Sequence, residues 1–150
     1  MKLSKNFSLA EIEHSNTAKR LGIKNEMSEE HLANMQNLID NLIQPLRDSI
    51  GPIRVTSGYR SPQLNKAIGG STRSQHSKGQ ALDLQYWKEG KMNNKVIYDW
   101  ILDSGLEFDQ IINEFDYAWI HISLKKNNNR GQILEAYKND KGKTKYKFAD

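Results

Sequence analysis

The stretch of sequence that decides the fold spans residues 74–83 and reads Ser74-Gln75-His76-Ser77-Lys78-Gly79-Gln80-Ala81-Leu82-Asp83. His76 and Asp83 are too far apart to share one turn of a helix, but a tight turn at Gly79 followed by a strand would bring them together. In that strand Leu82 and Leu84 share one face and suit a hydrophobic core, so Asp83 points from the other face into a cleft. The stretch therefore predicts half of a metal site.

A third ligand has to come from elsewhere, because catalytic zinc usually has three protein ligands and an open position. His121 fits this role, since Ile120 and Ile122 alternate with it along a predicted strand and form a core face. A neutral imidazole held on a rigid strand is a good zinc ligand, whereas the competing interpretation is a half-exposed strand histidine. The other two histidines, His14 and His31, lie on early helices whose polar faces explain them.

A general base is suggested by the register of a predicted β-hairpin, whose two apolar strands lie on either side of Asp116. If the turn is centred between Asp116 and Tyr117, Glu114 pairs with Trp119 and Ile112 pairs with His121. Glu114 and His121 then share a face, roughly 7–8 Å apart across the strands, which lets the carboxylate reach a water molecule near the histidine. Glu114 is therefore the predicted base, with Asp116 in reserve. The competing interpretation is a solvated glutamate, and a register slip of one residue would turn it away.

Helices come first along the chain and strands later, which indicates an α+β fold with N-terminal helices packed on a small antiparallel sheet. All 150 residues are expected to form a single domain. We expect helices over residues 8–14, 28–50, 64–68 and 94–104, and strands over 53–56, 80–85, 108–114, 119–124, 133–137 and 144–148. Pro45 is expected to kink the second helix, and Asn94 is expected to cap the fourth.

The composition excludes several classes of protein. The chain has no cysteine, so disulfides and thiolate metal ligands are absent. No apolar run approaches the roughly 20 residues that span a bilayer, and the first residues lack the apolar segment of a secretory signal, so we expect synthesis in the cytoplasm. The net charge of +4 favours an anionic partner only weakly, and the scattered lysines argue against nucleic acid. Serine catalysis lacks support because no GxSxG motif occurs.

Three motifs carry a resemblance to a known family: Ser74-x-His76-x-x-Gly79-x-Ala81-x-Asp83, Trp119-Ile120-His121 and Ser57-Gly58-Tyr59-Arg60-Ser61-Pro62. With these in view, the chain resembles the zinc peptidases of the M15 group, and more closely the small phage and prophage branch of that group. These enzymes are D-alanyl-D-alanine carboxypeptidases and L-alanyl-D-glutamate endopeptidases of bacterial cell walls, including many phage endolysins. The resemblance covers residues 7–124 and leaves 125–150 as a tail with a possible extra hairpin.

The resemblance implies that His76, Asp83 and His121 bind one zinc ion and that Arg60 lies at the substrate. Arginine could hold a substrate carboxylate through paired charge-assisted hydrogen bonds, whereas the competing interpretation is a surface arginine beside a turn. Other residues expected near the substrate or behind the ligands are Ser74, Tyr59, Gln110 and Trp119. Many members carry an acidic residue three positions before the last histidine, where this chain has Ala118. That departure leaves the identity of the base open.

The function predicted from these residues is hydrolysis of stem-peptide bonds in peptidoglycan by a monomeric zinc peptidase, after release or delivery to the cell wall by another factor. The sequence leaves open which bond is cut, and therefore whether the enzyme is a carboxypeptidase or an endopeptidase. A two-histidine, one-carboxylate set also suits iron. The alternative function is a zinc-binding structural or wall-binding module of a phage or prophage, without turnover. Binding of nucleic acid rests on net charge alone.

Overall fold

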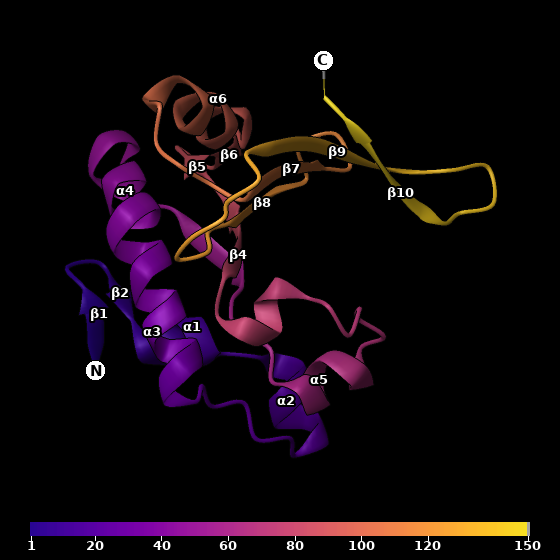
Figure 1. The fold of residues 1–150 in the computed structure, drawn as a ribbon. Helices are drawn as coiled ribbons and strands as arrows, with labels where there is room; N and C mark the ends of the chain where they lie inside the picture. Colours follow the sequence, from indigo (N-terminus) through magenta and orange to yellow (C-terminus); the bar gives the residue numbers. More distant parts are fainter. Residues whose placement is uncertain (150) are drawn as a thin grey trace.

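A six-stranded sheet forms the centre of the fold, and the structure, a computed structural model, describes residues 1–149. Its strands are β3 (Arg54–Ser57), β4 (Ala81–Gln85), β7 (Gln110–Glu114), β8 (Trp119–Ser123), β9 (Gln132–Lys138) and β10 (Thr144–Phe148). They lie in the order β10-β9-β7-β8-β4-β3 (Figure 1). Two short ribbons pair β1 (Lys2–Ser4) with β2 (Phe7–Ser8), and β5 (Trp87–Lys88) with β6 (Lys91–Met92).

The helices are short except for one long segment near the N-terminus. In chain order they are α1 (Leu9–Glu13), α2 (Asn16–Leu21), α3 (Glu29–Leu38), the π-helical turn η1 (Ile39–Ile43), α4 (Gln44–Ile50), α5 (Pro62–Ala67), the 3₁₀ turn η2 (Gln75–Lys78) and α6 (Lys95–Ser104). The expected α+β class is confirmed, although α2 was not predicted. No helix within residues 1–149 is long and apolar enough to cross a membrane.

The long helical segment runs from α3 through η1 into α4, as the apolar spacing over residues 28–50 predicted. Ser28 caps its start, because its hydroxyl accepts a hydrogen bond from the backbone N–H of His31. Pro45 is the second residue of α4 and cannot donate a backbone hydrogen bond, and the π-helical turn η1 lies directly before α4. The predicted irregularity is therefore a widened turn, and Gly51, at φ 95°, ends the segment.

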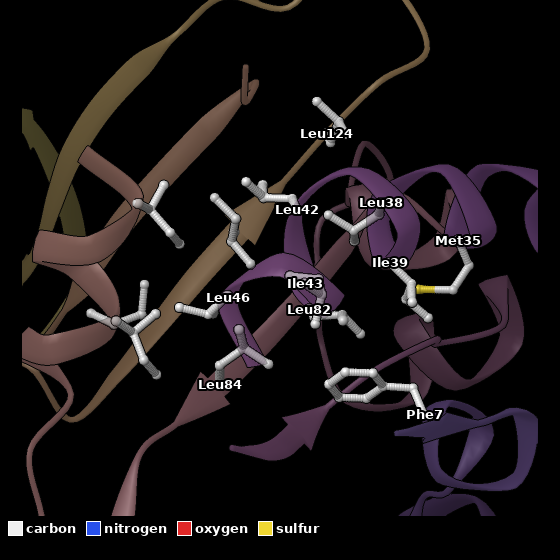
Figure 2. Packing of buried hydrophobic residues seen from close by; sticks show 14 of the residues in the cluster. Phe7, Met35, Leu38, Ile39, Leu42, Ile43, Leu46, Leu82, Leu84 and Leu124 are labelled. Carbon is white, nitrogen blue, oxygen red and sulfur yellow. The ribbon is translucent and has the colours of Figure 1, made fainter. Parts of the chain in front are cut away.

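One face of the sheet packs against this segment and α6. Figure 2 shows Ile43 and Leu46 of the helical segment close to Leu82 and Leu84 of β4, and all four side chains are completely buried. Burial of each such side chain is worth about 1.5–3 kcal/mol. Because side chains alternate along a strand, the opposite face of β4 is left for polar residues, as the sequence predicted.

The sheet is mixed, so the expectation of a purely antiparallel sheet is wrong at one pair. β9 runs parallel to β7, with Gln110 opposite Gln132 and Glu114 opposite Ala136. The reason is the position at which β8 ends: Ser123 lies opposite Gln110, at the start of β7. Residues 124–131 cross at that end, so β9 begins beside the start of β7 and must run in the same direction.

The tail folds into the predicted hairpin, and this hairpin extends the main sheet. β9 and β10 pair antiparallel from Thr144 opposite Lys138 to Phe148 opposite Leu134. The side-chain oxygen of Asn139 closes the turn by accepting the backbone N–H groups of residues 141 and 143. Figure 1 shows the hairpin, at the yellow end of the chain, extending away from α3 and α4.

Asn94 occupies the predicted N-cap position of α6, but it does not cap the helix through its side chain. Its side chain makes no capping hydrogen bond. It accepts the backbone N–H of Tyr86 and donates to the carbonyl oxygens of Tyr117 and Ala118, so it ties the β7–β8 turn to the end of β4. Burial explains the difference, because a buried amide must use its donors and acceptors fully, and the nearest unpaired backbone groups belong to other segments.

Candidate metal centre

Strand register places two of the predicted ligands side by side. Asp83 of β4 lies opposite His121 of β8, and His121 lies opposite Ile112 of β7. Directly paired residues point to the same face of a sheet, so both side chains emerge from the face turned away from the helices. The predicted pairings of Ile112 with His121 and of Glu114 with Trp119 are both confirmed.

The third residue, His76, reaches the same point from η2. Ser74 begins this turn, and its hydroxyl accepts the backbone N–H of His76 at 3.2 Å. Gly79 ends it with φ 72°, and a Cβ atom at this position would lie 2.2 Å from the backbone oxygen of His31. Only glycine fits both the left-handed conformation and the close approach, which is why the predicted turn lies here.

The tautomer of His76 follows from one hydrogen bond. Its Nδ1 lies 2.8 Å from the carbonyl oxygen of Gly58. A carbonyl only accepts, so Nδ1 carries the proton and Nε2 presents a lone pair. Within residues 1–149, this buried Nε2 has no hydrogen-bond partner, although it lies 3.3 Å from Oδ1 of Asp83. Two electron-rich atoms thus face each other, an arrangement that a cation between them would stabilise.

The donor atoms have the spacing that a metal ion requires. Oδ1 of Asp83 lies 3.0 Å from Nδ1 of His121 and 3.3 Å from Nε2 of His76. All three donor atoms lie within 4.8 Å of one another. In tetrahedral zinc sites with bonds of about 2.0–2.1 Å, neighbouring donors are about 3.3 Å apart. The distances between the donor atoms of the two imidazoles and the carboxylate therefore fit a zinc ion.

The protonation states of the buried pair also suit a metal. Burial lowers the pKa of His76 and so favours the neutral imidazole that binds metal, and the nearby carboxylate offsets this only in part. Burial alone would raise the pKa of Asp83, but its interactions with the two neighbouring imidazoles, His76 and His121, hold the pKa below its usual range. The carboxylate is therefore ionised near neutral pH.

A cavity of about 920 Å³ opens onto these three residues and also contains Glu114. Only 7% of Glu114 is exposed. Burial raises the pKa of Glu114 to about 7, His121 lowers it and Asp83 raises it. Asp116, the reserve base, lies on an exposed turn with φ 57° and does not line the cavity. Of the two carboxylates, the fold brings only Glu114 to the predicted ligands.

Comparison with known proteins then gives the family. A family model described as Peptidase M15 matches residues 5–123. The chain belongs to the Peptidase M15 family. A search of individually curated proteins found no match. Membership of this peptidase family supports a zinc peptidase, and the cluster of His76, Asp83 and His121 is where a zinc ion would fit in this M15 peptidase.

Four of the five remaining predicted residues of this M15 peptidase line the same cavity: Arg60, Ser74, Gln110 and Trp119. Tyr59 does not, so its expected place in the cleft is wrong. It is only 3% exposed, and its hydroxyl lies 3.1 Å from Nδ1 of His31. Its backbone N–H is bonded to the carbonyl oxygen of Ile12, which fixes the segment with the phenol turned into the core.

Sequence analysis missed several polar, charged and aromatic cavity residues and one leucine, and five of those named next lie in the tail. They include Arg73, Phe115, Arg130, Leu134, Lys138, Thr144 and Tyr146. The tail lies beyond the matched residues 5–123 and carries no motif of its own. Two signals could have found it: the alternation of polar and aromatic residues over 144–148, and the concentration of lysine in the last part of the chain.

Asp109 connects the tail of the M15 peptidase to the turn that carries His76. It is completely buried, and its carboxylate accepts hydrogen bonds from the side chain of Arg130 at 2.6 and 3.0 Å and from Gln75 at 3.0 Å. Burial alone would raise the pKa of Asp109, but the hydrogen bonds from Arg130 lower it to about 2. Because Gln75 precedes His76, this ionised carboxylate helps to hold η2 against the sheet.

Proposed function

We propose that this M15 peptidase is a zinc-dependent enzyme that hydrolyses peptide bonds in the stem peptides of bacterial peptidoglycan. The observation that carries the proposal is the convergence of His76, Asp83 and His121 on one point of a cavity that also holds the buried Glu114. Family membership supports the peptidase class. The cell-wall substrate rests on the resemblance of the motifs and on the charge of the cavity.

His76, Asp83 and His121 would hold the zinc ion. When bound, zinc supplies Lewis acidity, which polarises a peptide carbonyl and lowers the pKa of a coordinated water molecule. The protein sets the orientation of the ligands: the carbonyl of Gly58 holds the His76 ring, and the pairing of β4 with β8 holds the other two.

Glu114 is the proposed general base. It takes a proton from the attacking water and returns it to the leaving amine. Burial suits it for both steps, because a carboxyl group with a pKa of about 7 is nearly balanced between its two forms at neutral pH. Its position on a strand of the sheet, rather than on a loop, keeps its distance from the ligands fixed.

Arg60 is the proposed partner of a substrate carboxylate. It lines the cavity, and within residues 1–149 its Nε is buried without a hydrogen-bond partner. A partly buried guanidinium with a free donor is suited to bind an anionic group. Trp119 and Gln110 would contact the peptide from the floor of the cavity, and Ser74 acts through His76 by holding the turn that carries it.

The cavity volume favours a peptide segment over a single amino acid. At about 920 Å³ the cavity is near the upper end of the usual range for small-molecule pockets, roughly 300–1,000 Å³. Its carboxylates are Asp83 and Glu114, both of which have proposed roles in the chemistry, and its other charged residues are cations. Stem peptides carry free carboxylates, and these cations would be suited to bind them.

A zinc-binding module without turnover is the second candidate, and the observation that favours it is Ala118 at the position where the resemblance places an acidic residue. One experiment separates the two. Purified peptidoglycan is incubated with the zinc-loaded protein, and the released fragments are identified by mass spectrometry. We expect released peptides from the wild type, and none from Glu114→Gln, which keeps one zinc per chain. His76→Ala should lose the zinc, whereas His14→Ala, at an exposed site, should keep it.

Absence of fragments from the zinc-loaded wild type would exclude the peptidase. Release of fragments by Glu114→Gln at the wild-type rate would leave the peptidase intact and exclude Glu114 as its base. The masses of the fragments also report which bond is cut.

A further inference from the structure

The basic charge of the chain is concentrated in its last 26 residues. Residues 125–150 contain eight lysine or arginine residues and three acidic residues, a net charge of +5. The first 124 residues contain fourteen basic and fifteen acidic residues, a net charge of −1. Residues 125–150 lie beyond the residues that match the family model, so the role of this segment has to be derived from its own contacts.

The register of the sheet carries the hairpin directly into the site. Tyr146 lies opposite Ala136, Ala136 lies opposite Glu114, and Glu114 lies opposite Trp119. Directly paired residues share a face, so the inner face of the hairpin continues the face that bears the proposed base. Tyr146 and its neighbours Thr144 and Lys138 accordingly line the cavity.

Lys138 is held in place without being neutralised. Its Nζ donates a hydrogen bond to the hydroxyl of Thr144 at 2.7 Å and lies 5.0 Å from the centre of the Phe115 ring. Within residues 1–149 no carboxylate lies within ion-pair distance of it. On the outer face, by contrast, Lys147 has Glu135 at 3.9 Å. The ammonium group that faces the cavity therefore keeps its charge for another partner.

We propose that the β9–β10 hairpin forms a specificity wall of the active site, in which Lys138 binds a carboxylate of the substrate and the Tyr146 ring packs against the adjoining part of the peptide. The ligand class is an anionic peptide whose carboxylate reaches the hairpin while another group contacts Arg60. This inference rests on the proposed peptidase function. An ammonium group is suited to a carboxylate that approaches from several directions, because its three donors rotate freely.

The test uses two synthetic stem-type peptides that differ only in whether one side-chain group is a carboxylate or a carboxamide. We expect Lys138→Gln to raise KM for the carboxylate peptide about tenfold, to change KM for the carboxamide peptide less than about twofold, and to leave kcat unchanged. Lys138→Arg should retain the preference for the carboxylate. A merely structural role of Lys138 would affect both peptides equally.

The matched control is Lys145→Gln. Lys145 lies in the same hairpin, is exposed, and pairs with Tyr137, so it points to the outer face. The charge change is the same, and we expect no change in KM for either peptide. If Lys145→Gln weakens the carboxylate peptide as much as Lys138→Gln does, the hairpin attracts anions through its overall charge, and the inference is overturned.

Binding without turnover separates this inference from the peptidase proposal. The two peptides are titrated calorimetrically into zinc-loaded Glu114→Gln, with and without Lys138→Gln. If adding Lys138→Gln to Glu114→Gln weakens binding of the carboxylate peptide but not of the carboxamide peptide, the hairpin is supported as a specificity wall. This holds even if the wild type cleaves neither peptide. Equal affinities for the two peptides in Glu114→Gln would refute it, whatever the activity of the wild type.

Discussion

At the scale of single residues, the positions of the protons around Asp83 favour a cation at the candidate centre. The proton of His76 is committed to the carbonyl of Gly58, so the ring offers the carboxylate only a lone pair. A buried carboxylate that faces such an atom is unfavourable by itself. Glu114 lines the same cavity, but burial raises its pKa, whereas the pKa of Asp83 is lowered.

The shifted pKa of Glu114 predicts a pH-dependent stability. A carboxyl group whose pKa rises from 4.5 to about 7 on folding favours the folded state while it is protonated, and this contribution is lost as pH increases through that window. In zinc-free protein, the effect of Glu114→Gln on the free energy of unfolding should therefore depend on pH. The change that the substitution causes should be more favourable at pH 8 than at pH 4, by on the order of 1–2 kcal/mol. Urea denaturation at both pH values measures this.

Asp116→Asn is the control for that measurement, because its carboxyl is exposed in the neighbouring turn. The stability difference between this variant and the wild type should be the same at both pH values. A pH-independent effect of Glu114→Gln would show that the buried carboxyl is not the source of the trend.

At the scale of elements, two short connections position the site: the turn after η2 and the crossing from β8 to β9. Neither is regular structure, and each depends on one residue. Gly79 allows η2 to approach the backbone of α3, and Asp109 holds the crossing segment through Arg130. The sheet supplies rigidity, but these residues decide where His76 and the hairpin lie relative to it.

Gly79→Ala should damage the metal centre. The left-handed conformation alone costs about 1–2 kcal/mol for alanine, and here the new methyl group would also collide with the backbone of His31. Displacement of η2 should weaken zinc binding about tenfold or more, as measured by competition with a chelator. Gly131→Ala is the control, because Gly131 has φ 63° and an added methyl group there would have nothing within 4 Å. This variant should lose only the conformational free energy and keep its zinc affinity.

Asp109→Asn should destabilise the protein by about 2–4 kcal/mol at pH 7, because it removes a buried charge from Arg130 and Gln75. The pKa of Asp109 is lowered on folding from 3.8 to about 2, so this contribution is present above pH 4 and is lost as pH falls through that window. Urea denaturation at pH 7 and pH 2.5 should show the difference shrinking. A difference that stays constant, or equals that of the exposed Asp140→Asn, would contradict the assignment.

At the scale of the whole molecule, ligands from η2, β4 and β8 join segments that are far apart in the chain. A metal ion that binds the folded but not the unfolded state stabilises the fold by mass action. With free zinc at 1,000 times its Kd the gain is about 4 kcal/mol, which should raise Tm by roughly 10 °C. Differential scanning calorimetry with and without a chelator measures this. In His76→Ala the chelator should leave Tm unchanged, and the same shift in that variant would place the zinc elsewhere.

The parts of the molecule that could be predicted are the segments whose apolar residues recur at regular spacing and form a buried face. The alternation around Leu82 and around His121 determined the faces of β4 and β8, and with them the neighbours of the metal centre. Tyr59 was misplaced because it follows β3 in an irregular segment, where no period assigns a face. The parallel pairing of β9 with β7 follows from the crossing over residues 124–131, and the hydrogen bonds of Arg130 in that crossing to the buried Asp109 are a long-range contact that no local pattern records.

Two of the three donors lie on hydrogen-bonded neighbouring strands in the middle of the sheet, whereas His76 comes from a single 3₁₀ turn. Release of a zinc ion held by these three residues would therefore require only that this turn swing outward, while the strands stay paired. We therefore expect the dissociation rate of such an ion to follow the opening of residues 74–79 rather than unfolding of the whole chain.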